Sequence, residues 1–347
     1  MKIELALRVF PPSQVGRLAA IGEAAGFDAV SVNETARDSI VAASVAAAAT
    51  RTTEIATSVS LAFPRSPTIT AMAAWDLQEL SGGRFTLGLG PQVRGHIQRR
   101  FGLAWSPPAP WMREYVQALR ALWRAFAGES PLDHRGDRYK LTLLTREFNP
   151  GPQPFGPPRV HLAAVGRAMS RLAGEVADGL RTHPLMTPKY LTEVTVPAIR
   201  EGRLRAGRSG DPFDLIAASF QAIGDSDEEI ARAREEARRM VAFYASTPSY
   251  RPVLTVHGLD DLGQKLSRMV AGGKWDQIAA EVPDDVLDVF ALSGRLEDLP
   301  RLVSERYRGV ITRFALFSPS AALLAEEDRL AALVGAVQNG AEPLVWD

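Results

Sequence analysis

A glycine-rich segment is the part of the chain whose residue types and spacing best suit a ligand. It reads SGGRFTLGLGPQVRGH over residues 81–96, so a short apolar stretch ends in glycines and runs into polar and basic side chains. Glycine at a strand end allows close approach of another group to the backbone. The third glycine of a Rossmann fingerprint is missing, and so is the Gly-Lys-Ser/Thr of a P-loop. Two interpretations stay open: a tight turn before a solvated basic helix, or a loop against a flat cofactor with arginines facing its acidic groups.

Two further segments are candidates for lining a site. HLAAVGRAMS over residues 161–170 places Gly166 where a strand ends and a helix begins. A helix N-terminus offers free N–H groups and a positive dipole end, which suit a phosphate, although a glycine turn without a ligand fits the same residues. Thr182 and His183 end the next strand and could line the same region, but a lone histidine is more often an ordinary hydrogen-bonded residue.

Metal and nucleophile chemistry have little support in the sequence. The five histidines, at positions 96, 134, 161, 183 and 257, form no HxH or HExxH pair, so no metal site is predicted. The chain has no cysteine, which excludes disulfides and thiolate chemistry, and it has no GxSxG elbow. A bound organic cofactor is therefore the natural source of reactivity.

The composition is that of an ordinary soluble enzyme. The 347 residues include 40 Lys+Arg and 40 Asp+Glu, so the formal net charge is zero, which argues against nucleic acid or a membrane surface as a partner. No run of about eighteen apolar residues predicts a membrane span. The N-terminal MKIELALRVFPP is too short and too interrupted by charges for a signal peptide. We expect a cytoplasmic protein whose partner is a small-molecule substrate.

Alternating strand and helix patterns determine where these segments lie. Eight strand–helix units predict an α/β fold, a (β/α)8 TIM barrel in a single domain over residues 1–347, rather than a doubly wound open sheet. In such a barrel, ligands bind at the carboxyl ends of the strands. The expected strand and helix pairs are Ile3–Val9 and Ser13–Ala25, Phe27–Val32 and Ser39–Thr50, Glu54–Ala62 and Pro67–Leu80, Arg84–Leu89 and Pro110–Ala127, Arg159–Ala164 and Met169–Ala177, Gly179–Thr182 and Pro188–Ala206, Phe213–Ala222 and Asp227–Tyr244, Val310–Phe317 and Ser320–Val337.

Two stretches do not fit this alternation. A loop excursion rich in proline and glycine occupies residues 131–158, and a helical insertion is expected at about residues 247–305, between strands seven and eight. Loops of this length in a compact domain are usually lids or interface elements.

Four segments together resemble a known superfamily. SGGRFTLGLGPQVRGHIQRRFG, MREYVQALRALW, FNPGPQP and HLAAVGRAMSRLAGEVADGL are similar to the luciferase-like monooxygenases. More narrowly, they resemble the oxidoreductases that depend on the deazaflavin coenzyme F420, including methylene-tetrahydromethanopterin reductase-like proteins. The resemblance spans about residues 1–318. It implies a TIM barrel with an insertion after a late strand, and F420, or alternatively FMN, lying across the strand ends.

The resemblance also implies cofactor-binding residues. The ring and its side chain would be bordered by the residues after the fourth strand, and the phosphate would be held by Gly166 and Arg167. A non-proline cis peptide common in the superfamily would lie near Ser58 and Val59. The residues implied after the fourth strand are Gly90, Gln92, Val93 and Arg94.

The sequence departs from the F420 enzymes at the expected proton donor. Several of them have a histidine and a tryptophan after strand two and a glutamate after strand four, whereas this chain has VNETARD and GPQV there. Glu34 is the nearest replacement, with an ion pair to Arg37 as the alternative explanation, and His183 is the other candidate for moving a proton.

The predicted reaction is hydride transfer between deazaflavin C5 and a small organic substrate. Two alternatives stay open: an FMN-dependent luciferase-like monooxygenase, and a non-catalytic barrel that binds a flavin or deazaflavin. A homodimer through the helix Pro67–Leu80, which carries Met72, Trp75 and Leu77, is possible on sequence grounds, but packing of that face on the barrel explains it as well.

Overall fold

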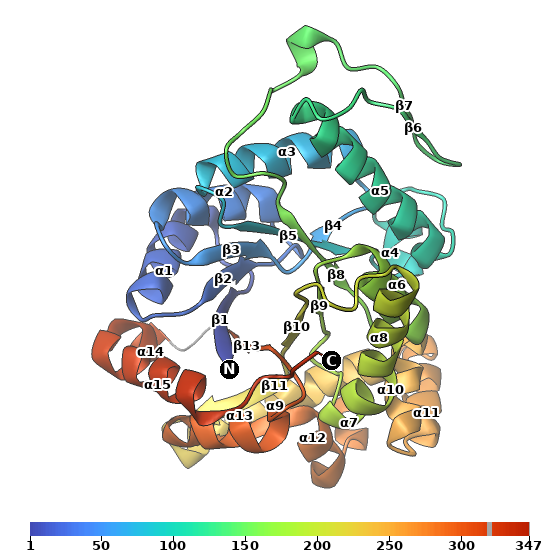
Figure 1. Cartoon of the computed structure of the whole chain (residues 1–347). Helices are drawn as coiled ribbons and strands as arrows, with labels where there is room; N and C mark the ends of the chain where they lie inside the picture. The colour runs from blue at the N-terminus through green and yellow to red at the C-terminus, as the bar shows by residue number, and fades with distance from the viewer. Residues whose placement is uncertain (318–320, 347) are drawn as a thin grey trace.

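A closed barrel of eight parallel strands forms the centre of the computed structural model, which describes residues 1–317 and 321–346 (Figure 1). Neighbouring strands pair in parallel register, and pairing of β3 with β5 closes the ring. The predicted (β/α)8 TIM barrel is confirmed. The barrel strands are β1 (Lys2–Leu7), β2 (Ala29–Val32), β3 (Glu54–Thr57) with its continuation β4 (Ser60–Leu61), β5 (Phe85–Gly90), β8 (Arg159–Ala163), β9 (Gly179–Arg181), β10 (Asp214–Ala217) and β13 (Arg313–Phe317).

Helices surround this barrel on the outside (Figure 1). The described residues contain no helix long and apolar enough to cross a membrane. The start of the last expected helix, Ser320, lies outside the described residues. The surrounding helices are α1 (Pro12–Ala24), α2 (Ser39–Ala49), α3 (Pro67–Leu80), α5 (Pro108–Phe126), α6 (Arg167–Val176), α7 (Pro188–Tyr190) running through the π-helical turn η2 (Leu191–Thr195) into α8 (Val196–Arg205), α13 (Leu299–Tyr307), α14 (Ala321–Ala325) and α15 (Glu327–Gly340).

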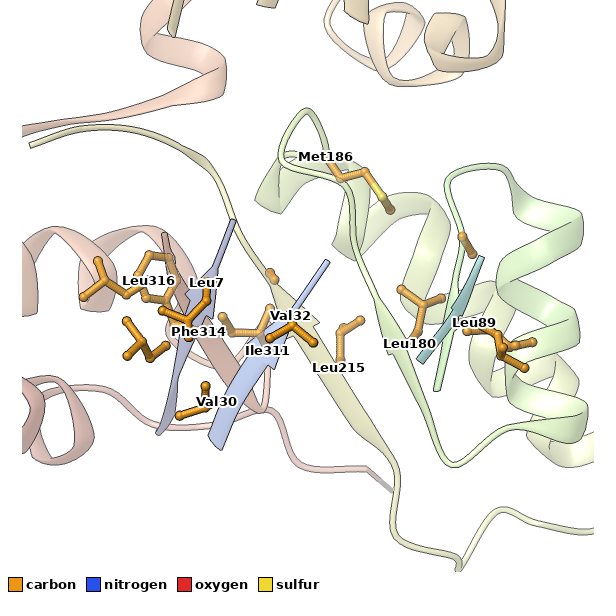
Figure 2. Packing of buried hydrophobic residues seen from close by; sticks show 14 of the residues in the cluster. Leu7, Val30, Val32, Leu89, Leu180, Met186, Leu215, Ile311, Phe314 and Leu316 are labelled. Atoms are coloured by element: carbon orange, nitrogen blue, oxygen red, sulfur yellow. The ribbon is translucent and has the colours of Figure 1, made fainter. Parts of the chain in front are cut away.

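The hydrophobic core lies between the strands and the helices. Alternate strand residues such as Val30, Leu180 and Leu215 are buried there, because successive side chains of a strand point to opposite faces (Figure 2). This packing fixes the register of every strand and therefore the position of the loops at both barrel ends.

The interior of the barrel holds an ion-pair network and a small apolar cluster formed by Ala6, Ile216, Ala218 and Ala315. Arg313 is fully buried and contacts the carboxylates of Glu4 at 3.3 Å and Glu54 at 2.8 Å. Arg181 donates to the other oxygen of Glu4 at 2.7 Å, and Arg313 approaches Asp214 at 3.8 Å. Because the charges alternate in sign, each buried ion has a partner, which is the condition under which buried charges are tolerated.

The excursion over residues 131–158 extends away from the barrel beside α3 and α5 (Figure 1). It contains the small antiparallel pair β6 (His134–Arg135) and β7 (Lys140–Leu141) and the turn η1 (Arg146–Phe148). The indole of Trp75 on α3 ties its return to the barrel by donating to the Gly151 carbonyl at 3.1 Å.

The expected seventh strand, Phe213–Ala222, is wrong as a single strand. β10 ends at Ala217, and β11 (Phe220–Gly224) instead pairs in parallel with β12 (Ala291–Arg295) in a separate two-stranded sheet. The chain leaves the barrel after β10 because β11 pairs with β12 rather than with a barrel strand. The sequence did not reveal this break, because the partner of β11 lies about seventy residues further along the chain and no local pattern reports such a pairing.

The segment between β11 and β12 packs around that small sheet. α9 lies mainly on β11, β12 and the helices of this segment. The remaining elements here are α9 (Asp227–Ala245), η3 (Pro248–Tyr250), α10 (Arg251–Val256), α11 (Asp260–Ala271), η4 (Trp275–Glu281), α12 (Asp284–Phe290) and, after β12, η5 (Leu296–Asp298).

Candidate functional site

A cavity of about 560 Å³ opens at the carboxyl ends of the barrel strands. The ends of all eight barrel strands, or the loops that follow them, contribute to it, and Tyr244 and Tyr250 add a wall from the segment between β11 and β12. The size is in the range of cavities that bind small molecules and cofactors. The predicted site residues that line the cavity are Glu34, Ser58, Val59, Gly90, Gln92, Val93, Arg94, Gly166 and His183.

One wall of the cavity is formed where β3 passes into β4. The Ser58–Val59 peptide is cis, as the resemblance predicted. Gly90 at the end of β5 lies against this wall, and a Cβ at that position would come within 2.5 Å of Val59 Cγ2. Glycine is therefore needed at position 90 for Val59 to occupy its place on the wall.

The loop after β5 turns at Gln92, which has a φ of 61°. The side-chain oxygen of Gln92 accepts a hydrogen bond from the N–H of Val93 at 2.8 Å, and the short helix α4 (Arg94–Arg99) follows.

The arginines of this loop lie at or outside the edge of the cavity. The guanidinium of Arg94 stacks over the Trp105 ring at 5.3 Å, so this cation stays at the edge of the cavity. Arg99 and Arg100 lie outside the lining, and Arg100 donates to the Thr35 carbonyl at 2.5 Å.

The N-terminus of α6 meets the cavity beside the loop after β5, because β8, which precedes α6, pairs with β5. Gly166, Ala168 and Met169 line the cavity, and no side chain caps this helix end. The N–H groups of its first turn are therefore available to an anion. The Arg167 side chain is not brought to the cavity, because its guanidinium is mostly exposed and pairs with Glu201 at 2.9 Å.

Glu34 is held by neighbours on three segments. Its carboxylate accepts hydrogen bonds from the Ser39 hydroxyl at 2.9 Å and the Leu61 N–H at 3.1 Å, and it pairs with Arg65 at 2.7 Å. The ion-pair partner is thus Arg65 rather than the expected Arg37. Arg65 also pairs with Asp38 at 2.6 Å, so Glu34 ties the loop after β2 to the chain that follows β4.

His183 lies in an aromatic environment. Its ring centroid is 4.1 Å from that of Tyr244 and 4.6 Å from that of Tyr250, and its Nδ1 accepts a hydrogen bond from the Leu185 N–H at 3.1 Å. Burial, with a contribution from the charge of Arg8, lowers the pKa of His183 to about 3. The imidazole is therefore neutral at physiological pH and carries its proton on Nε2.

Several lining residues had no signal in the sequence. Arg8, Trp105, Phe220, Tyr244 and Tyr250 line the cavity although none belongs to a recognisable motif. The tyrosines come from the segment between β11 and β12, whose placement over the barrel depends on long-range strand pairing. Among the described residues, no group of three or more potential metal ligands comes together.

A family profile and two related proteins match most of this chain. A sequence profile of the luciferase-like monooxygenases matches residues 3–313. An uncharacterized protein of Mycobacterium tuberculosis is 41% identical over 305 residues, covering 87% of this chain and 90% of the relative. The 5,10-methylenetetrahydromethanopterin reductase of Archaeoglobus fulgidus is 30% identical over 276 residues, covering 78% of each chain.

The fold has a solved counterpart. The structure of the coenzyme F420-dependent tetrahydromethanopterin reductase from Methanopyrus kandleri superposes with a TM-score of 0.76 at 22% identity, covering 98% of this chain and 99% of that one. At this identity the match concerns the fold. The resemblance predicted from the four sequence segments is confirmed.

Proposed function

The chain belongs to the luciferase-like monooxygenase family, and we propose that within it the protein is a coenzyme F420-dependent oxidoreductase. The proposed reaction is hydride transfer between deazaflavin C5 and a small organic substrate. The observation that carries the proposal is the convergence on one cavity of three segments: the Ser58–Val59 wall, the loop from Gly90 to Arg94, and the uncapped N-terminus of α6.

These segments fit a flat cofactor with a phosphate. The Val59 wall and the loop after β5 would border the ring, because a planar group can lie against glycine backbone without a clash. The first-turn N–H groups of α6 would hold the phosphate, with Gly166 leaving open space next to them. When bound, the deazaflavin would supply the two-electron chemistry that the side chains lack.

The cavity residues would orient the substrate and exclude water. Hydride transfer needs the reacting atoms held at about 3–3.5 Å, which a pre-formed wall achieves better than a mobile loop. Glu34 has its carboxylate occupied by Arg65, Ser39 and Leu61, so we assign it the task of fixing the loop after β2. The neutral His183 would act as a hydrogen-bond donor rather than as a charged acid.

We prefer F420 over FMN for two reasons: the positive charges near the cavity, and the names of related proteins. Arg94 lies at the edge of the cavity, and the exposed Arg99 ends the same short helix; such cations suit the anionic tail of F420. The relative from Archaeoglobus fulgidus and the fold counterpart from Methanopyrus kandleri carry names of reductases rather than monooxygenases. The family description names monooxygenases, and one of the solved structures with this fold is a monooxygenase in complex with FMN, so an FMN-dependent monooxygenase is the second candidate.

Direct binding tests the proposal. The purified protein is titrated with F420, followed by its fluorescence, and separately with FMN. Micromolar binding of F420 is the expected result. Tight binding of FMN without binding of F420 would overturn the F420 assignment, and oxygen uptake with reduced FMN would then identify the monooxygenase.

We also propose a homodimer through α3. The structure corrects which residues of this helix are available: Trp75 and Leu77 are buried against the barrel, whereas Ile69, Met72 and Leu80 are 59%, 44% and 51% exposed. Three large apolar side chains exposed on one helix would form the self-complementary patch that a two-fold interface needs.

A further inference from the structure

Three aromatic rings meet on one wall of the cavity. His183 follows β9, Tyr244 lies on α9 and Tyr250 ends η3, and all three line the cavity. The two tyrosine ring centroids are 5.4 Å apart, and each lies within 5 Å of the His183 ring. We call these three residues the aromatic cluster. It brings His183 together with two tyrosines from a single segment that lies about sixty residues further along the chain.

The polar atoms of the aromatic cluster are not used within the protein. Over residues 1–317 and 321–346, neither tyrosine hydroxyl makes a hydrogen bond, and the His183 ring makes only the one that Nδ1 accepts from Leu185. Polar groups in such places are normally satisfied by a ligand or by water. The cluster therefore offers two O–H groups and one N–H group to the occupant of the cavity.

The charges of the groups on this wall indicate which kind of ligand atom would bind there. His183 is neutral, and burial raises the pKa of both Tyr244 and Tyr250, so all three groups keep their protons at neutral pH. Arg8 stacks over the Phe317 ring at 4.8 Å and brings a positive charge to the same wall. Neutral donors beside a cation stabilise an oxygen on which negative charge develops, and they disfavour a cationic ligand.

We propose that the aromatic cluster binds an oxygen atom of the substrate, and that the substrate is a carbonyl compound or the alcohol formed from it. This inference rests on the proposed function, which supplies the reduced deazaflavin as reductant. In the reducing direction the carbonyl carbon gains the hydride, the C=O π bond breaks, and the oxygen takes a proton from the Tyr244 hydroxyl. Solvent then returns a proton to Tyr244.

Tyr244 is assigned as the proton donor because its ring is the nearer of the two tyrosine rings to His183, at 4.1 Å against 4.6 Å for Tyr250. Burial raises the pKa of Tyr244, and the positive charge of Arg8 opposes that rise and so favours the phenolate left after proton transfer. Tyr250 and the Nε2–H of His183 are the positioning donors for the same oxygen. Donors that are already in place need no reorganisation when the charge develops.

Binding of a carbonyl probe tests this inference without turnover. Isotopically labelled acetophenone is bound to the full-length protein, and its carbonyl stretch is recorded by infrared difference spectroscopy. Ethylbenzene, which has the same shape without the oxygen, is the matched ligand. The variants are Tyr244→Phe and Tyr250→Phe, and the control is Tyr139→Phe, because Tyr139 does not line the cavity.

We expect the carbonyl band to lie at lower frequency than in hexane, and each cluster variant to reverse part of that shift. Loss of one hydrogen bond should weaken acetophenone binding by about five- to tenfold and leave ethylbenzene binding unchanged. A band that neither cluster variant moves, or failure of acetophenone to bind, overturns the inference. F420 titration of the same samples separates the outcomes: intact F420 binding leaves the proposed function standing, and its loss in the unmodified protein refutes that function instead.

Discussion

The ion-pair network inside the barrel leads to a quantitative prediction for Glu54. Burial by itself would raise the pKa of this carboxyl, but the charge of Arg313 and the hydrogen bonds from it, at 3.1 and 2.8 Å, lower the pKa to about 2. An unperturbed glutamate has a pKa of 4.5. The difference corresponds to about 3 kcal/mol of folding free energy at neutral pH.

The sign of the pH dependence follows from the lowered pKa. The unfolded chain binds the proton first as the pH falls, so the stabilisation is complete above about pH 5 and is lost as the pH falls toward 2. We expect Glu54→Gln to be less stable than the unmodified protein by about 3 kcal/mol at pH 7, and the difference to shrink by most of that amount between pH 5 and pH 2.

Urea unfolding followed by circular dichroism, at a series of pH values, measures this difference. Glu305→Gln is the matched control, because Glu305 pairs with Arg301 on the surface, where such pairs contribute about 0–1 kcal/mol. A stability difference between Glu54→Gln and the unmodified protein that stays constant from pH 7 to pH 2 would refute the assignment of that energy to the Glu54 charge.

Three further predictions concern the cavity and the surface. Arg94→Gln should weaken F420 binding by about fivefold or more, and Arg99→Gln, on the same helix but outside the cavity lining, should change it by less, as measured by fluorescence titration. Gly90→Ala should displace Val59, lower the unfolding free energy by about 1–3 kcal/mol and weaken cofactor binding; unchanged binding would show that this wall is not part of the cofactor site. Met72→Lys should convert the proposed dimer to a monomer in sedimentation analysis, and an unaffected dimer would place the interface elsewhere.

The barrel could be predicted because each of its units repeats a local pattern. An apolar strand such as Phe85–Gly90 is followed by an amphipathic helix, and this alternation needs no knowledge of distant residues. The loop after β5 was found for the same reason, because Gly90 marks a backbone position where a Cβ would meet Val59. Gly166 marked the end of β8 although its φ of −78° and the open space around it would accept another residue.

The interior charges and the partner of Glu34 were outside the reach of that reasoning. Arg181 and Arg313 are the single charges of their strands, Glu4 shares β1 with Lys2, and only closure of the barrel brings the three together. A charge in a strand at a position that faces the interior is a signal that could have been used. Arg65 was missed as the partner of Glu34 because Arg37 is nearer in sequence, whereas parallel strands bring the ends of β2 and β4 together.

The cavity thus combines two parts of different origin. The proposed cofactor side is built from strand ends and glycine turns of the barrel, so its position follows from the fold. The cofactor-binding residues predicted from sequence that line the cavity belong to this side, whereas the predicted His183 belongs to the opposite wall. The opposite wall takes Tyr244 and Tyr250 from a segment that is anchored by the pairing of β11 with β12. That segment can change without disturbing the strand register on which the barrel depends, because its small sheet is separate from the barrel sheet. We therefore expect relatives with different residues in this wall to bind different substrates, while the geometry of the proposed cofactor side stays the same.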